Sequence, residues 1–194
     1  MNNLMEIKTT KTSFLKMESE LLIVGLFKDK KLNSELKKMD VSISNQLSHA
    51  MELDAFIGKK DDRLSIYGNE SIKRILLIGL GEMKNYNTDR VRSIASDIVN
   101  YANGLRIKSF TLDGDSLGLK KDQLAQAFSE GLILGSYEFN DYKTKKSENL
   151  RVTSIVIHGN IDNKSLAKGR VLGSSVCFAR DLGNHPANIL TPTY

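Results

Sequence analysis

Residues 73 to 81 read Lys73-Arg-Ile-Leu-Leu-Ile-Gly-Leu-Gly81, and this stretch decides the fold. Between Ile75 and Leu80 its large apolar side chains follow one another without any polar alternation. Such a run is typical of a strand buried on both faces, which occurs where helices cover both sides of a mostly parallel sheet. The carboxyl end of such a strand is also where open α/β sheets usually bind ligands.

The two glycines at positions 79 and 81 match only half of the glycine pattern of a phosphate-binding loop. Glu82, Met83 and Lys84 follow them, so the third glycine of such a loop is missing. A glycine pair alone is a weak indication of phosphate binding. We therefore interpret Gly79 and Gly81 as a tight turn from strand to loop.

Strands and helices are predicted to alternate along the rest of the chain. Strands are expected at 5–11, 20–27, 63–67, 105–112 and 150–158, and helices at 42–56, 91–102, 120–137 and 162–184. Asn103-Gly104 is expected to close the second helix with a left-handed cap. This alternation predicts an α/β fold, a three-layer αβα domain with a mixed, mostly parallel sheet.

Two helices carry patterns that predict how they pack. Gly131 and Gly135 lie four residues apart in the third helix, and glycine there costs about 1 kcal/mol relative to alanine. The pair therefore indicates close approach to another backbone. In the last helix a stripe is expected to form one side, consisting of Leu166, Ala167, Val171, Ser174, Phe178 and Leu182. The chain then runs into Pro186 and Pro192, which cannot continue a helix.

Composition indicates a globular protein of 194 residues, with 40% hydrophobic and 26% charged residues. The net charge of +5 comes from scattered lysines or short pairs, among them Lys37-Lys38, Lys59-Lys60 and Lys145-Lys146. No aromatic residues interleave with them, so a solvated surface is favoured over nucleic-acid binding. We expect a cytoplasmic protein, because the N-terminus lacks a signal-peptide pattern and no apolar run is long enough to cross a bilayer.

Residues that could carry out chemistry occur singly in the sequence, and none has the partners that a catalytic site requires. Cys177 has no disulfide partner and is expected to be a small core residue. His49 stands alone in its helix, and His158 ends a strand with no acid near it in sequence. Asp113-Gly-Asp115 lacks the ligand series of a calcium loop, so we expect a solvated turn.

Four segments resemble the leucyl (cytosol) aminopeptidase family. The segment Ala179-Arg-Asp-Leu-Gly-Asn-His-Pro-Ala-Asn-Ile-Leu-Thr-Pro192 resembles the pattern R-D-L-x-N-x-P-x-N-x-L-T-P that opens the family's catalytic region. Residues 130–143 resemble its pattern E-G-x-x-L-x-x-Y-x-F-x-x-Y-K, and residues 53–54 and 73–81 agree in order and spacing. The resemblance covers the chain from about residue 50 onward.

The resemblance implies a two-metal exopeptidase that releases N-terminal amino acids from peptides. It implies an N-terminal domain similar to the macro domain at 1–160, then a linker helix and the start of a catalytic domain at 161–194. Two divalent cations, zinc or manganese, and a homohexamer are further implications. The family's metal ligands and its motif N-T-D-A-E-G-R-L would lie beyond position 194. Asn87-Thr88-Asp89-Arg90 departs from that motif at Val91, so we interpret it as a helix cap.

No catalytic, cofactor-binding or metal-binding residue is therefore assigned within this chain, which we expect to act as a scaffold. An alternative of another class stays open. It is a macro-like module that binds ADP-ribose or a related nucleotide near residues 79–83 and 113–117. A nucleic-acid-binding protein ranks last, because the lysines form no stripe.

Overall fold

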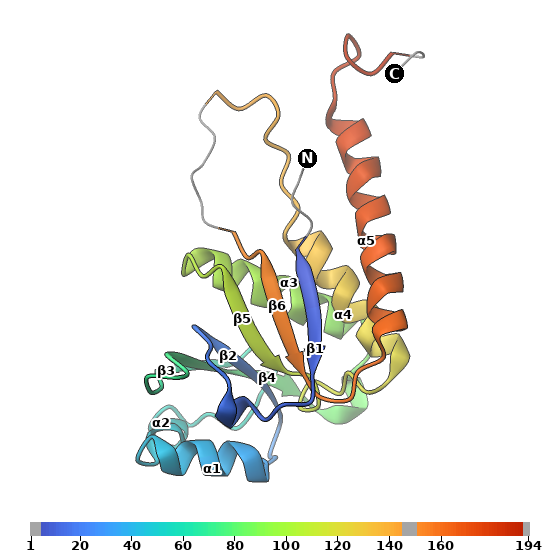
Figure 1. The fold of residues 1–194 in the computed structure, drawn as a ribbon. Helices are drawn as coiled ribbons and strands as arrows, with labels where there is room; N and C mark the ends of the chain where they lie inside the picture. Colours follow the sequence, from blue (N-terminus) through green and yellow to red (C-terminus); the bar gives the residue numbers. More distant parts are fainter. Residues whose placement is uncertain (1–4, 145–150, 192–194) are drawn as a thin grey trace.

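Six strands form one sheet in the computed structural model, which describes residues 5–144 and 151–191 (Figure 1). The strand order is β1-β6-β5-β2-β4-β3, and every pair is parallel except the antiparallel pair β3–β4. This confirms the mixed, mostly parallel sheet. The strands are β1 (Glu6–Thr10), β2 (Leu22–Phe27), β3 (Arg63–Tyr67), β4 (Arg74–Gly81), β5 (Ser109–Asp113) and β6 (Ser154–His158).

Helices cover both faces of this sheet. The helices are α1 (Ser34–Ser42), α2 (Gln46–Leu53), α3 (Thr88–Gly104), α4 (Asp122–Gly135) and α5 (Asn163–Asn184). Figure 1 shows α1 and α2 on one side of the sheet and α3 and α4 on the other, with α5 running alongside α4. The predicted three-layer α/β architecture is therefore confirmed.

Strand β4 is buried on both faces, as its unbroken apolar run predicts. Leu77 is fully buried in the core beneath α1 and α2. Ile78 is 5% exposed and belongs to the core beneath α3 and α4. β4 pairs with β2 on one side and with β3 on the other, so its backbone groups are satisfied within the sheet.

The glycines of α4 allow it to lie close to α3. A Cβ at Gly131 would lie 2.4 Å from the carbonyl oxygen of Arg92, and one at Gly135 would lie 2.6 Å from the Cα of Ser96. Neither position has room for a side chain. The predicted close approach of this helix to another backbone is confirmed.

The single helix expected at 42–56 is wrong, because two shorter helices occupy 34–53. Ser44 and Asn45 both have φ of 59°, a left-handed conformation that interrupts a right-handed helix. The buried carboxylate of Asp40 accepts hydrogen bonds from the backbone N–H groups of Leu47 and Ser48, which start α2. This capping interaction lets the chain begin a second helix immediately after the first.

The end of α3 and the start of β5 also differ from expectation. Gly104 belongs to the helix, and the left-handed residue of the connection is Arg106, with φ of 58°. β5 then begins at Ser109 rather than at Leu105. Ile107 is 7% exposed and packs in the core, so its apolar character reflects a buried turn and not a longer strand.

Helix α5 contacts α4 through its small residues and not through the predicted apolar stripe. A Cβ at Gly169 would lie 2.2 Å from the carbonyl oxygen of Gln126, and Gly173 lies against Ile133. Within the stripe, Leu166 is buried, but Val171 and Phe178 are 65% and 61% exposed. The predicted long helix is confirmed, but the residues of the stripe differ in burial, because close contact with α4 requires glycine and the stripe contains none.

Cys177 also lies on α5 and is half-buried, so it is not the core residue that we expected. Its Sγ lies 3.9 Å from the carbonyl oxygen of Ile133. Burial raises the pKa of this thiol, which disfavours the reactive thiolate.

Within the described residues no helix is long and apolar enough to cross a membrane.

Candidate functional site

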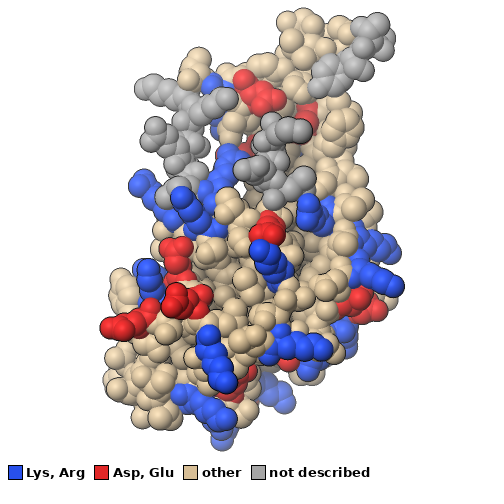
Figure 2. All heavy atoms as spheres, in the orientation of Figure 1, with Lys and Arg blue, Asp and Glu red and all other residues tan. Residues whose placement is uncertain are grey.

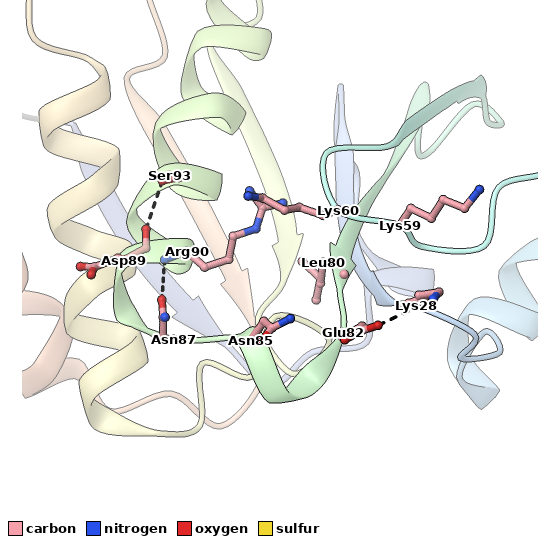
Figure 3. Close-up of a pocket in the computed structure, with 11 residues that line it drawn as sticks. Lys28, Lys59, Lys60, Leu80, Glu82, Asn85, Asn87, Asp89, Arg90 and Ser93 are labelled. Carbon is pink, nitrogen blue, oxygen red and sulfur yellow. Dashed lines mark hydrogen bonds and ion pairs between the residues drawn. The ribbon is translucent and has the colours of Figure 1, made fainter.

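A cavity of about 730 Å³ opens at the carboxyl end of β4, between the segment that precedes β3 and the start of α3 (Figure 3). This is the sheet edge at which α/β folds usually bind ligands. Basic and polar side chains dominate its wall, and we call it the basic pocket. Its lining residues are Lys28, Lys59, Lys60, Leu80, Gly81, Glu82, Asn85, Asn87, Asp89, Arg90 and Ser93.

The two glycines of β4 shape one wall by seating segment 58–62 against the strand. A Cβ at Gly79 would lie 1.8 Å from the carbonyl oxygen of Lys59, and Gly81 has φ of 76°. The N–H of Gly79 donates to the carbonyl of Asp62 at 2.8 Å, and that of Gly81 donates to Gly58 at 3.0 Å. Because both amides are used in this way, neither is free to bind a phosphate as a glycine-rich loop would. Both glycines lie within β4, so the expected turn does not include Gly79, and the chain leaves the strand only at Gly81 with its left-handed φ.

The first turn of α3 forms the opposite wall. Asn87 caps the helix, since its Oδ1 accepts a hydrogen bond of 2.9 Å from the backbone N–H of Arg90. This confirms that Asn87-Thr88-Asp89-Arg90 is a cap. Asp89 forms an ion pair of 2.7 Å with Arg92, on the next turn of the helix.

The guanidinium of Arg90 is held firmly beside the pocket. It forms an ion pair of 2.7 Å with Asp61 through Nη1, and its side chain is only 12% exposed. Its Nε is buried and has no hydrogen-bond partner among the described residues. A buried N–H group without a partner is unfavourable, although the charge of this guanidinium is compensated by Asp61.

The lysines of the pocket differ in how far they are neutralised. Lys28 lies 3.8 Å from Glu82, which is itself held more closely by Lys84 at 3.0 Å. The hydrogen bond and charge of Lys84, followed by the charge of Lys28, lower the pKa of Glu82 and keep it ionised. Lys59 and Lys60 have exposed side chains and form no ion pair within the described part of the chain. Positive charge therefore exceeds negative charge around the cavity.

A second polar cluster joins the ends of β5 and β6. The parallel register places His158 beside Asp113, and their Nδ1 and Oδ1 atoms are 3.6 Å apart. Glu35, in the first turn of α1, lies 4.0 Å from Nε2 of the same histidine. Sequence reasoning found no acid near His158, because its two acidic neighbours come from a different strand, β5, and from helix α1.

Asp113 is buried, so the expected solvated turn is wrong at this position. Its carboxylate accepts hydrogen bonds from the backbone N–H groups of Asp115 and Ser116 and from the side chain of Asn33. Burial raises the pKa of Asp113, while the Ser116 N–H and the charge of His158 act in the opposite direction. These contacts tie the turn after β5 to the start of α1, which is a structural role.

The remaining candidates do not assemble into a site. His49 is exposed on α2, as expected of a surface residue. Asp115 forms an exposed ion pair of 3.3 Å with Lys120. Across residues 5–144 and 151–191, no group of three or more His, Cys, Asp or Glu side chains could hold a metal ion.

On the face seen in Figure 2, lysine and arginine side chains are spread over the surface with acidic side chains between them. They do not gather into one stripe on this face. The arrangement fits the solvated surface predicted from the sequence rather than a nucleic-acid interface.

Comparison with known proteins gives one consistent family. Residues 23–146 match the family model described as the cytosol aminopeptidase family, N-terminal domain. A probable cytosol aminopeptidase of Persephonella marina is 31% identical over 97% of this chain, and one of Alkaliphilus oremlandii is 29% identical over 97%. The chain spans 40% of the length of each of these curated relatives.

Solved structures of a leucine aminopeptidase and of a bottromycin maturation enzyme share the fold of this chain. A tomato leucine aminopeptidase carrying the mutation K354E superposes with a TM-score of 0.74 at 22% identity, over 97% of this chain and 40% of that one. The bottromycin maturation enzyme BotP in complex with Mn gives a TM-score of 0.66 at 19% identity, over 90% of this chain and 34% of that one. These likenesses show the fold, and none of the named proteins supports the ADP-ribose alternative.

Proposed function

Since this chain belongs to the cytosol aminopeptidase family, we propose that it is the N-terminal domain of a two-metal enzyme that releases N-terminal amino acids from peptides. The observation that carries the proposal is the family match over residues 23–146, together with relatives that align along nearly the whole chain. The described residues would serve as scaffold, and the peptide bond would be cleaved elsewhere in the complete enzyme.

The chemistry proposed for the complete enzyme is metal-assisted hydrolysis. Two divalent cations, zinc or manganese, would activate a water molecule and polarise the scissile carbonyl. The name of the relatives, cytosol aminopeptidase, supports a cytoplasmic location for the complete protein. We also propose that the complete enzyme assembles as a homohexamer, on the family resemblance of residues 179–192.

We propose residues 1–160 as the domain proper and 161–194 as a linker that leads into the catalytic part. The exposed side of α5 supports this division. Val171, Leu172, Val176 and Phe178 are 42–65% exposed on it, although α5 is firmly seated on α4 by its glycines. Exposed apolar groups that gather on one element usually mark an interface. In the complete enzyme this side of α5 would pack against the catalytic part.

The test is hydrolysis of leucine p-nitroanilide with added zinc or manganese. The chain of 194 residues should give no turnover above the metal-only blank. The complete open reading frame should give turnover that a chelator abolishes and that metal restores.

Two results would contradict the proposal. One is activity of the 194-residue chain that persists through repurification, and the other is an inactive complete protein.

The variant Phe178→Ser in the complete protein tests the proposed packing of α5. It should weaken the packing of α5 against the catalytic part. It should lower thermal stability there more than in the 194-residue chain.

A further inference from the structure

We propose that the basic pocket binds a compact phosphate-type anion, such as a phosphate or diphosphate group. This assignment is independent of the peptidase chemistry proposed above. It rests on the charge, the donor groups and the shape of a cavity that the proposed function does not use.

Charge is the first argument. Four cationic side chains line the cavity, against the two carboxylates of Glu82 and Asp89. Both carboxylates already lie in ion pairs with basic residues outside the lining, Lys84 and Arg92. Lys60 and Lys59 form no ion pair within the described residues, and Figure 3 shows Lys60 extending towards α3 and Lys59 away from it.

The donors approach from different walls, which suits an anion with several acceptor oxygens. Figure 3 shows Lys60 extending from segment 58–62 into the space in front of α3, while Arg90 rises from α3 itself. Lys28 contributes from the end of β2. A phosphate offers more acceptor oxygens than a carboxylate, so it can engage all three walls at once.

The first turn of α3 borders the same space. The first N–H groups of a helix have no partner within it, and the helix dipole favours negative charge there. Asn87 uses its Oδ1 as the cap, which leaves its Nδ2 as a donor at the cavity wall. The buried Nε of Arg90 lacks a hydrogen-bond partner, while the charge of its guanidinium is paired with Asp61. The anion would therefore lie between α3 and Lys60.

The lining favours a compact anion over a nucleotide. No aromatic side chain is among the residues that line the cavity, so nothing there would stack a base. Asn85, Asn87 and Ser93 supply polar groups in its place. The ligand class is therefore a small phosphate or diphosphate group and not a nucleoside.

The experiment is an NMR titration of the 194-residue chain with sodium pyrophosphate, at ionic strength held constant with NaCl. Saturable shifts are expected at the amides of Gly81, Glu82 and Arg90. The double variant Lys59→Ala/Lys60→Ala should weaken binding by about tenfold, because two free charges are lost. The matched control Lys37→Ala/Lys38→Ala removes the same charge from exposed positions on α1, on the other side of the sheet, and should bind as the unmodified chain does.

Three results would overturn the proposal. They are the absence of saturable shifts, an equal loss of affinity in the two double variants, and equally tight binding of succinate. The last would show a site for dicarboxylates instead of phosphate groups. The single variant Lys60→Gln should weaken binding in the same direction, and its amide spectrum tests whether the fold is retained.

Discussion

Strand β4 and helix α5 are both rich in large apolar side chains, but they meet the rest of the protein differently. Every apolar residue from Ile75 to Leu80 is at most 5% exposed, whereas Phe178 on α5 is 61% exposed. β4 lies between two helical layers and must be apolar on both faces. α5 packs chiefly against α4, with Gly169 and Gly173 at the contact, and its Asn163 accepts a hydrogen bond from Thr9 of β1. An apolar pattern thus predicts that a surface will be covered without specifying what covers it.

The largest expected effect tests the buried side of this comparison. Leu77→Ala in β4 should lower the free energy of unfolding by about 2 to 5 kcal/mol, because the fully buried side chain leaves a cavity. Val171→Ala on the exposed side of α5 is the matched control and should cost less than about 1 kcal/mol. Urea denaturation measures both. A cost below about 1 kcal/mol for Leu77→Ala would mean that β4 is covered on one face only.

The next prediction tests the glycine contact of α5. Gly169→Ala should cost about 1 to 3 kcal/mol, because the new Cβ would lie 2.2 Å from a backbone oxygen of α4. Gly183→Ala, on the same helix with no atom within 4 Å, should instead stabilise by up to about 1 kcal/mol. Hydrogen exchange along α5 measures both changes. Equal effects would contradict the close contact between α4 and α5.

Asp113 in the sheet should respond to pH with the opposite sign to Asp162, the cap of α5, whose pKa the hydrogen bond from Ser165 lowers. Since burial raises the pKa of Asp113 in the folded protein, the unfolded chain ionises first as pH rises. The stability contributed by the protonated carboxyl is complete below about pH 4 and is lost as pH rises through the higher folded-state pKa. Urea unfolding across this pH range should show a decrease in the unmodified chain that is missing in Asp113→Asn.

The exposed Asp115→Asn is the control for this pH series and should keep the decrease. An increase in stability of the unmodified chain over the same range would carry the opposite sign. If Asp113→Asn lacks this increase, the N–H donors and His158 outweigh burial at Asp113; if it keeps the increase, the source is another carboxyl, such as Glu82 or Asp162, whose pKa is lowered.

The smallest effect is expected at the exposed side of α5. Phe178→Ser should change the free energy of unfolding of the 194-residue chain by less than about 0.5 kcal/mol. Phe128→Ser, at a fully buried position on α4, should severely destabilise the fold. Thermal denaturation compares the two. A cost above about 1 kcal/mol for Phe178→Ser would show that this side chain packs on its own domain.

Much of the fold follows from local patterns in the sequence. The unbroken run of β4 predicts a strand buried on both faces, and Gly131 and Gly135 predict the approach of α4 to α3. Helix α1 was missed because four of its nine residues, in Ser34–Ser42, are charged and obscure its apolar face. The side of α5 that faces α4 was not predicted, because a helical repeat does not reveal that the neighbouring helix requires glycine.

The candidate site was less predictable, because its residues come from separate segments. Lys28, Lys60 and Arg90 meet only after β2, β4 and α3 are placed, and the adjacent pair Lys59-Lys60 was the only local indication. For His158 and Asp113 the sequence contains a better local indication that the two residues lie together. Each ends an apolar strand and precedes a glycine, so two neighbouring parallel strands bring them together.

The position of β1 in the sheet determines when this domain can finish folding. β1 lies at the edge of the described sheet and pairs there only with β6. The pairing joins Glu6 to Ser154, at the start of β6. During synthesis the first strand therefore leaves the ribosome long before its partner exists. Strands so distant along the chain pair slowly, because a long loop must close before the pairing gains any favourable contacts. The nascent chain must keep an unpaired strand soluble in the meantime, and the charged side chains of Glu6 and Lys8 on β1 discourage its pairing with other chains.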